Sequence, residues 1–150
     1  MTGRPSDYRS VVHPLRMETR VFLVASTHPC IRIRDEAAKP TGRDYRTVDA
    51  GELAALDPPR QWVLAVLLCP GDDAAEVVAW LGAHGGDPDR VLFILHPGTD
   101  AVAALRPWYA AGFPDAVAIE AAAWGQLAKP LGQFVNDWIY AQAKGMGWPL

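Results

Sequence analysis

Several features that define large protein classes are missing from this sequence of 150 residues. Two cysteines are too few for a disulfide-rich secreted scaffold, and we interpret Cys30 and Cys69 as reduced, buried thiols of a cytoplasmic protein. No apolar run approaches the roughly 18–20 residues that a membrane span needs. The basic N-terminal residues have no apolar stretch beside them, so we expect no signal peptide and no membrane contact.

A strong excess of one charge is also missing. The formal net charge is −3, with ten basic against eight acidic residues over 1–60 and four against nine over 61–150. Neither half has the basic balance that is typical of nucleic-acid binding. Contact with DNA would depend on arginines gathering on one face, although a solvated surface is the simpler interpretation: Arg32, Arg34, Arg43, Arg46 and Arg60.

A glycine-rich phosphate loop is the third missing feature. Residues 25–30, which follow the first predicted strand, read Ala-Ser-Thr-His-Pro-Cys and contain no glycine. They match neither Gly-x-Gly-x-x-Gly nor the P-loop pattern, and side chains there would keep a phosphate away from the backbone amides. This excludes the common nucleotide-binding classes, and we expect no cofactor.

The features that are present are those of an α/β protein. Residues 91–95 are an unbroken apolar run, which predicts a strand covered on both faces. His96-Pro97-Gly98 ends that strand, Thr99 is placed as the N-cap of a helix, and Gly112 ends the helix. The same pattern of strand and helix recurs, with strands expected at 20–25, 45–48, 62–68, 91–95 and 116–119.

The predicted fold is therefore an open, mostly parallel five-stranded sheet with helices on both faces, a three-layer arrangement. Residues 1–19 show no clear period and are expected to form an N-terminal arm, and residues 20–150 a single domain. Asp49 and Asp73 each precede a glutamate by three residues, which is capping-box spacing for two further helices. Pro130 is placed as the first residue of the last helix.

Polar side chains follow three of the predicted strands, where ligands of α/β proteins bind. They define a candidate pocket: Ser26, His28, Cys69 and His96. Ser26 or Cys30 with a histidine would be a nucleophilic pair, but no Gly-x-Ser-x-Gly elbow accompanies them. The Cys and His spacings fit no known zinc pattern. A structural turn is the simpler interpretation, so we assign no catalytic residue and no metal ligand.

Three aspartates lie at predicted helix starts: Asp72, Asp73 and Asp100. Helix capping explains them most simply, and the alternative is an acidic pocket that binds Mg²⁺.

Residues 61–67 (Gln-Trp-Val-Leu-Ala-Val-Leu) and 87–98 resemble a pair of core strands in the delta subunit of the bacterial DNA polymerase III clamp loader, in its first, AAA+-like domain. Residues 131–147 are similar to that family's closing helix, Trp-Ile-x-x-x-Ala-x-x-x-Gly. The resemblance implies a non-catalytic domain without a P-loop that binds a sliding clamp or another replisome subunit through a hydrophobic wedge. The wedge maps to residues 53–61, which have no phenylalanine and give five candidate contacts: Leu53, Leu56, Pro58, Pro59 and Arg60.

Residues 67–73 (Leu-Leu-Cys-Pro-Gly-Asp-Asp) also resemble the segment after the third strand of response-regulator receiver domains. Residues 111–115 and Lys129-Pro130 are similar to that family's Ala-Gly-Ala-Asp and Lys-Pro. Val66 then stands where the phosphoacceptor aspartate belongs, so the resemblance implies a degenerate receiver that binds a partner protein, which includes a second copy of itself. Strand order separates the two families, because receivers have the order 2-1-3-4-5 and AAA+ domains place strand one between three and four. A small α/β enzyme is the remaining alternative.

Overall fold

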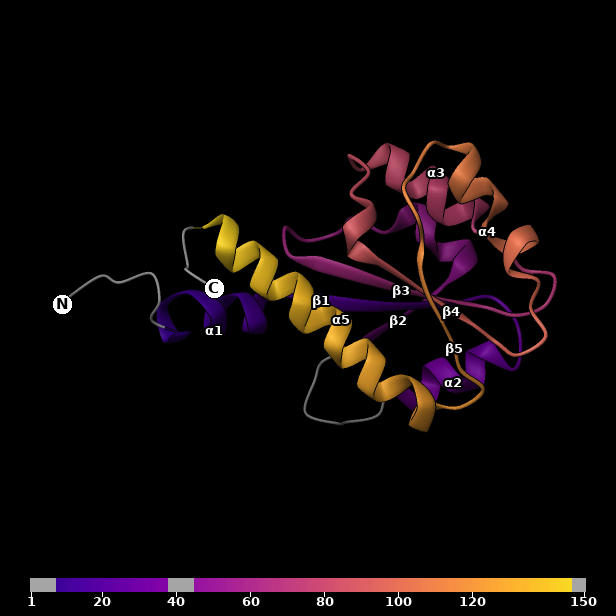
Figure 1. Ribbon diagram of the computed structural model, residues 1–150, viewed down its shortest axis with the longest axis horizontal. Helices are drawn as coiled ribbons and strands as arrows, with labels where there is room; N and C mark the ends of the chain where they lie inside the picture. Colours follow the sequence, from indigo (N-terminus) through magenta and orange to yellow (C-terminus); the bar gives the residue numbers. More distant parts are fainter. Residues whose placement is uncertain (1–7, 38–44, 147–150) are drawn as a thin grey trace.

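The computed structural model describes residues 8–37 and 45–146, which form a five-stranded parallel sheet between two layers of helices (Figure 1). The strands are β1 (Arg20–Ala25), β2 (Tyr45–Asp49), β3 (Trp62–Leu68), β4 (Val91–Leu95) and β5 (Val117–Glu120). The α-helices are α1 (Tyr8–Glu18), α2 (Cys30–Ala37), α3 (Ala75–Ala83), α4 (Ala101–Ala110) and α5 (Trp124–Gly145), with 3₁₀ helices η1 (Ala50–Ala55) and η2 (Pro88–Arg90). The predicted fold class is confirmed.

The strand order is β2-β1-β3-β4-β5, and every neighbouring pair is parallel. This is the order expected of a receiver, and it differs from the order expected of an AAA+ domain. The chain moves outward from β1 to β2, returns to pair β3 with β1, and then continues to β4 and β5 on the other side. The direction therefore reverses between β1 and β3, which makes their carboxyl ends the topological switch point of the sheet.

Strand β3 lies at the centre of the sheet and is buried along its whole length. Its side chains alternate between the two faces, with Val63, Ala65 and Leu67 in one core and Leu64, Val66 and Leu68 in the other. An apolar run without polar alternation is typical of burial on both faces. One core is covered by α1, α2 and α5, and the other by η1, α3 and α4.

Helix α1 occupies most of the segment expected to be an N-terminal arm. Its Val12 and Leu15 are 0% and 3% exposed in the same core as α5. Arg16 Nη1 donates a hydrogen bond to Asn136 Oδ1 of α5 at 3.2 Å. Figure 1 shows α1 lying alongside the last part of α5, beyond the end of the sheet where the strands begin. Residues 8–18 are therefore an integral element of the fold.

Two helix starts differ from the prediction. Asp100, not Thr99, is the N-cap of α4, because its carboxylate accepts from the amides of Val102 and Ala103 at 3.0 and 3.3 Å. The Thr99 hydroxyl donates instead to the carbonyl of Leu68 at 3.3 Å. Helix α5 begins at Trp124, so Pro130 lies inside it and is not its first residue.

Arg34 was expected among exposed arginines, but it is only 7% exposed. Its guanidinium pairs with Asp35 at 3.0 Å and with Asp49, and donates to the Val48 carbonyl. Asp49 is therefore engaged by Arg34 and makes no capping bond to η1, contrary to the capping-box prediction. Arg43 lies outside the described residues.

Candidate functional site

The switch point holds a small cavity between the carboxyl ends of β1 and β3. Helix α2 follows β1 on one face of the sheet and α3 follows β3 on the other, so the two connecting loops separate there. The cavity has a volume of about 210 Å³, which is below the ~300 Å³ of most small-molecule sites. It is lined by Val24, Ala25, Ser26, Val66, Leu67, Leu68, Gly71, Asp72, Asp73, Glu76 and Val77.

Asp72 joins the two loops at this cavity. Its carboxylate accepts hydrogen bonds from Thr27 Oγ1 at 2.8 Å, from Ser26 Oγ at 3.3 Å and from the Cys69 amide at 2.9 Å. Helix capping was the expected role of Asp72, but α3 begins three residues later, with no side-chain cap at its N-cap residue. The adjacent Asp73 accepts from the amide of Ala75 at 2.9 Å.

A disulfide bond between Cys30 and Cys69 also joins the two loops. The prediction of two reduced thiols is therefore wrong, whereas their burial is confirmed at 1% and 2% exposure. Parallel pairing of β1 with β3 brings the start of α2 beside the end of β3, so that residues 39 apart in the chain have Cα atoms 6.3 Å apart. Sequence spacing alone does not reveal this approach.

The predicted pocket residues share this edge of the sheet but do not form a catalytic arrangement. Ser26 is bonded to Asp72, and the Cys69 sulfur is bonded to Cys30. The His96 amide donates to the Leu68 carbonyl at 2.9 Å, and its Nδ1 lies 3.2 Å from the neighbouring Pro97 carbonyl. His28 is exposed. Among the hydrogen bonds of the described residues, none joins a histidine to Ser26.

The polar lining of the cavity carries negative charge from Asp72, Asp73 and Glu76, and no basic side chain of the described residues lines it. This arrangement disfavours a phosphate or carboxylate ligand. Across residues 8–37 and 45–146, no group of three or more His, Cys, Asp or Glu side chains has an arrangement that could hold a metal ion.

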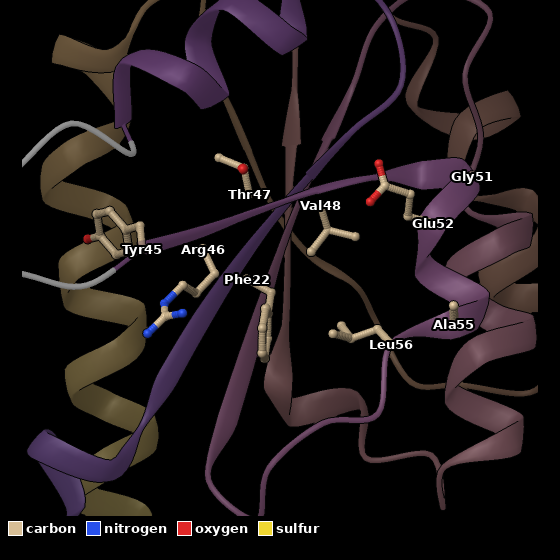
Figure 2. Close-up of a pocket in the computed structure, with 9 residues that line it drawn as sticks. All are labelled: Phe22, Tyr45, Arg46, Thr47, Val48, Gly51, Glu52, Ala55 and Leu56. Atoms are coloured by element: carbon tan, nitrogen blue, oxygen red, sulfur yellow. The ribbon is translucent and has the colours of Figure 1, made fainter.

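A second, wider cavity of about 790 Å³ lies at the β2 edge of the sheet, beside η1. Figure 2 shows Val48 on the same side of β2 as Phe22 and Leu56, with Thr47 directed to the opposite side. Because η1 is only six residues long, it covers this end of the sheet less fully than a longer helix would. Glu52 of η1 adds a carboxyl group to the lining.

The carboxyl groups next to this cavity influence one another. The pKa of Asp49 is lowered, first by its hydrogen bond with Arg34 and then by one with Glu52. The pKa of Glu52 is raised by its hydrogen bond with Asp49 and by the negative charge of that neighbour. Arg34 therefore stabilises the charge on Asp49, and Glu52 retains its proton to a higher pH than an isolated glutamate.

The candidate clamp-binding residues differ in their exposure. Leu53 is 1% exposed in the core beneath η1, so it has no surface for a partner. Leu56 is half-buried in the wall of the wider cavity, and its carbonyl accepts from Trp80 Nε1 at 3.0 Å. Pro58 is half-buried, while Pro59 and Arg60 are exposed.

Exposed apolar side chains gather on α4 and β5. Val102, Tyr109 and Val117 are 73%, 47% and 49% exposed. Val102 and Tyr109 are seven residues apart, which places them on one side of α4. The Tyr109 hydroxyl accepts from the Ala116 amide at 3.1 Å, so this helix face adjoins β5. Val117 pairs with Leu92, whose side chain lies in the core beneath α5, so Val117 and α4 lie on opposite faces of the sheet, on either side of its β5 edge. We call the surface of these three residues around this edge the α4–β5 surface. The sequence held a signal for it, because α4 has apolar residues besides those that it buries against the sheet: Ala104, Leu105 and Trp108.

Comparisons of the chain with protein-family models, with characterised proteins and with solved structures give no match. Within the described residues, no helix combines the length and apolar character needed to cross a membrane. Function is therefore inferred from the fold, the strand order and the exposed surfaces.

Proposed function

We propose that this protein is a receiver-like domain that acts by binding a protein partner and is not regulated by phosphorylation. The observation that carries the proposal is the strand order β2-β1-β3-β4-β5. The receiver resemblance requires that order, and the AAA+ resemblance requires a different one. A cytoplasmic location belongs to the same proposal.

The residue at the phosphoacceptor position supports a role without phosphorylation. Val66 is 2% exposed, and its side chain packs in the core beneath α3 and α4. Phosphoryl transfer to a receiver needs a carboxylate nucleophile and a bound Mg²⁺ ion. Asp72 is the nearest acidic residue after β3, but its oxygens are held by Ser26, Thr27 and the Cys69 amide.

The α4–β5 surface supplies the contact, and a second copy of the chain is the partner that fits it. Arg106 is exposed on α4, Asp115 is exposed two residues before β5, and Glu120 is exposed as the last residue of β5. No ion pair among the described residues engages these three side chains. In a two-fold dimer the same surface meets itself, so the basic group of one copy can face an acidic group of the other around an apolar centre.

Sedimentation velocity of the full chain tests this proposal. We expect a dimer whose dissociation constant rises at least about tenfold in Val117→Asp, since a charge is then buried in an apolar contact. Met17→Asp is the matched control, because Met17 is 65% exposed on α1, away from α4 and β5. A small-molecule phosphodonor should leave the dimer dissociation constant of each variant and of the wild type unchanged. A chain that stays monomeric at high concentration, or that responds to the phosphodonor, contradicts the proposal.

The clamp-loader function receives less support, because the strand order differs and Leu53 is buried. It predicts that the chain binds a sliding clamp and that Leu56→Asp abolishes this binding. Surface plasmon resonance on an immobilised clamp measures the affinity directly. Binding that requires Leu56 would replace the receiver proposal, whereas a wild-type chain with no affinity for the clamp would remove the alternative.

A further inference from the structure

The two cysteines form a covalent link at the switch point of the sheet. Cys30 is the first residue of α2, and Cys69 follows the last residue of β3. Their disulfide ties the loop after β1 to the loop after β3, on either side of the acidic cavity. Neither cysteine belongs to the α4–β5 surface, and the proposed dimer makes no use of the disulfide.

The surroundings of the sulfur atoms also suit two thiols. Both cysteines lie in the apolar core beneath α1, α2 and α5, where a thiol packs as a small hydrophobic group. The Cys69 sulfur lies 3.9 Å from the Thr27 carbonyl, which would accept a hydrogen bond from the Cys69 thiol. Reduction therefore leaves no charge and no unpaired donor in the core at Cys69.

The fold has extensive apolar packing besides the disulfide. Two apolar layers cover the sheet, and β3 is buried on both faces. A domain of this size buries enough apolar surface to fold without a covalent staple. We therefore expect the reduced chain to keep the same architecture.

We propose that Cys30 and Cys69 are a reversible redox pair that controls how tightly the two loops at the switch point are held together. The oxidant is a low-molecular-weight disulfide. One cysteine thiolate attacks it, forming a mixed disulfide and releasing one thiolate of the oxidant. The second cysteine thiolate then attacks the protein sulfur of the mixed disulfide and releases the other. Each cysteine loses one proton and one electron, and the small disulfide becomes two thiols.

Reduction should loosen the loop after β1 selectively. In the oxidised protein, residues 26–29 are held to the opposite loop by the disulfide and by the bonds of Ser26 and Thr27 to Asp72. In the reduced protein those two hydrogen bonds remain, together with the weak bond from the Cys69 thiol to the Thr27 carbonyl. The bonds of Ser26 and Thr27 involve exposed side chains that also bond to water. The mouth of the acidic cavity then opens more often.

Alkylation and intact-mass measurement test the chemistry. The full chain is equilibrated in buffers of oxidised and reduced glutathione, quenched with acid, and then unfolded and treated with iodoacetamide, so that buried thiols also react. Because the chain has only two cysteines, the mass distinguishes zero, one and two alkyl groups without ambiguity. We expect a transition from no alkylation to double alkylation as the buffer becomes reducing. Double alkylation in every buffer, or none even in excess dithiothreitol, overturns the proposal.

Hydrogen exchange then tests the structural consequence. On reduction, amide exchange at residues 26–28 and 71–73 should accelerate at least about tenfold, while β3 and β4 stay protected. The unfolding equilibrium constant should rise by up to about 10³-fold, as expected for a link that closes a loop of 39 residues. The double variant Cys30→Ala/Cys69→Ala is the control and should not respond to reductant. Global unfolding of the reduced chain would show a structural staple instead of a switch, and unchanged exchange in both loops would also refute the proposal.

Discussion

The hydrogen bond between Thr27 and Asp72 at the switch point allows us to predict a coupling free energy between these two residues. Asp72 accepts three hydrogen bonds, and the shortest, at 2.8 Å, comes from Thr27. A hydrogen bond to a charged group contributes about 1.5–3 kcal/mol when water is excluded, and less at a site as exposed as this one. We therefore expect a coupling free energy of about 1 kcal/mol between Thr27 and Asp72.

A double-mutant cycle measures this coupling. Thr27→Val removes the hydroxyl with little change of shape and should lower the free energy of unfolding by about 1 kcal/mol. Asp72→Ala removes all three bonds and should cost about 2–3 kcal/mol, or roughly 1 M in urea midpoint. The double variant should lose about 1 kcal/mol less than the sum of the two single losses.

Urea unfolding followed by circular dichroism, in one oxidising buffer so that the disulfide is constant, gives the four free energies. The control cycle pairs Thr27→Val with Asp73→Asn, because Asp73 bonds to the Ala75 amide and not to Thr27. We expect the control pair to be additive within about 0.3 kcal/mol. If the coupling free energy of Thr27 and Asp72 is no larger than that of the control pair, this hydrogen bond does not stabilise the contact between the two loops, and the prediction is wrong.

Three further predictions concern the core and the pH dependence of stability. Trp108 is 1% exposed and its Nε1 donates to the Pro114 carbonyl at 2.8 Å, so Trp108→Ala should cost about 4 kcal/mol in urea unfolding and Trp108→Phe about half as much. Because the pKa of Asp49 is lowered in the fold, its charged carboxylate stabilises the fold at pH values above 3.8, the ordinary pKa of the group. Below that pH this stabilisation should be lost in wild type, whereas Asp49→Asn has no such contribution to lose. The raised pKa of Glu52 acts in the opposite sense, so stability gained on acidification toward pH 4.5 should be smaller in Glu52→Gln, as measured by thermal unfolding at a series of pH values.

Much of the sheet could be predicted because its strands carry their own signal. Residues 62–68 and 91–95 were both expected as strands, and burial on two faces was predicted for 91–95. Both strands are buried along their whole length. Turn residues were informative as well. Gly112, for example, has a φ of +87° directly after the end of α4, a conformation that favours glycine. Strand existence and type followed from local chemistry alone.

The helix boundaries and side-chain roles that the local sequence pattern did not predict depend on contacts between distant segments of the chain. Helix α1 was missed because its apolar residues find their partners on α5, more than a hundred residues away. The start of α5 was misplaced because Pro130 suits a first turn, yet the helix already extends from Trp124. Capping was expected of Asp49 and Asp72, whose carboxylates are bound instead by Arg34 and by the loop after β1.

The candidate site was predictable in place but not in composition. Ser26, Cys69 and His96 were expected at one edge of the sheet, since parallel strands bring their carboxyl ends together, and they lie there. The disulfide and the role of Asp72 depend on which loops face each other, and strand order decides that. Strand order follows from the packing of the whole chain. Because the sequence permits two strand orders, it does not determine which residues form the site.

The packing of α1 against α5 has a practical consequence for work on this protein. Both helices extend beyond the end of the sheet where the strands begin, opposite the edge that carries the disulfide and Asp72 (Figure 1). A polypeptide fused before α1 or after α5 would therefore emerge on the same side of the domain. A fluorophore or an immobilisation tag placed there leaves the switch point accessible to reagents. Two fluorophores, one before α1 and one after α5, would lie close to each other, so energy transfer between them would report separation of the two helices.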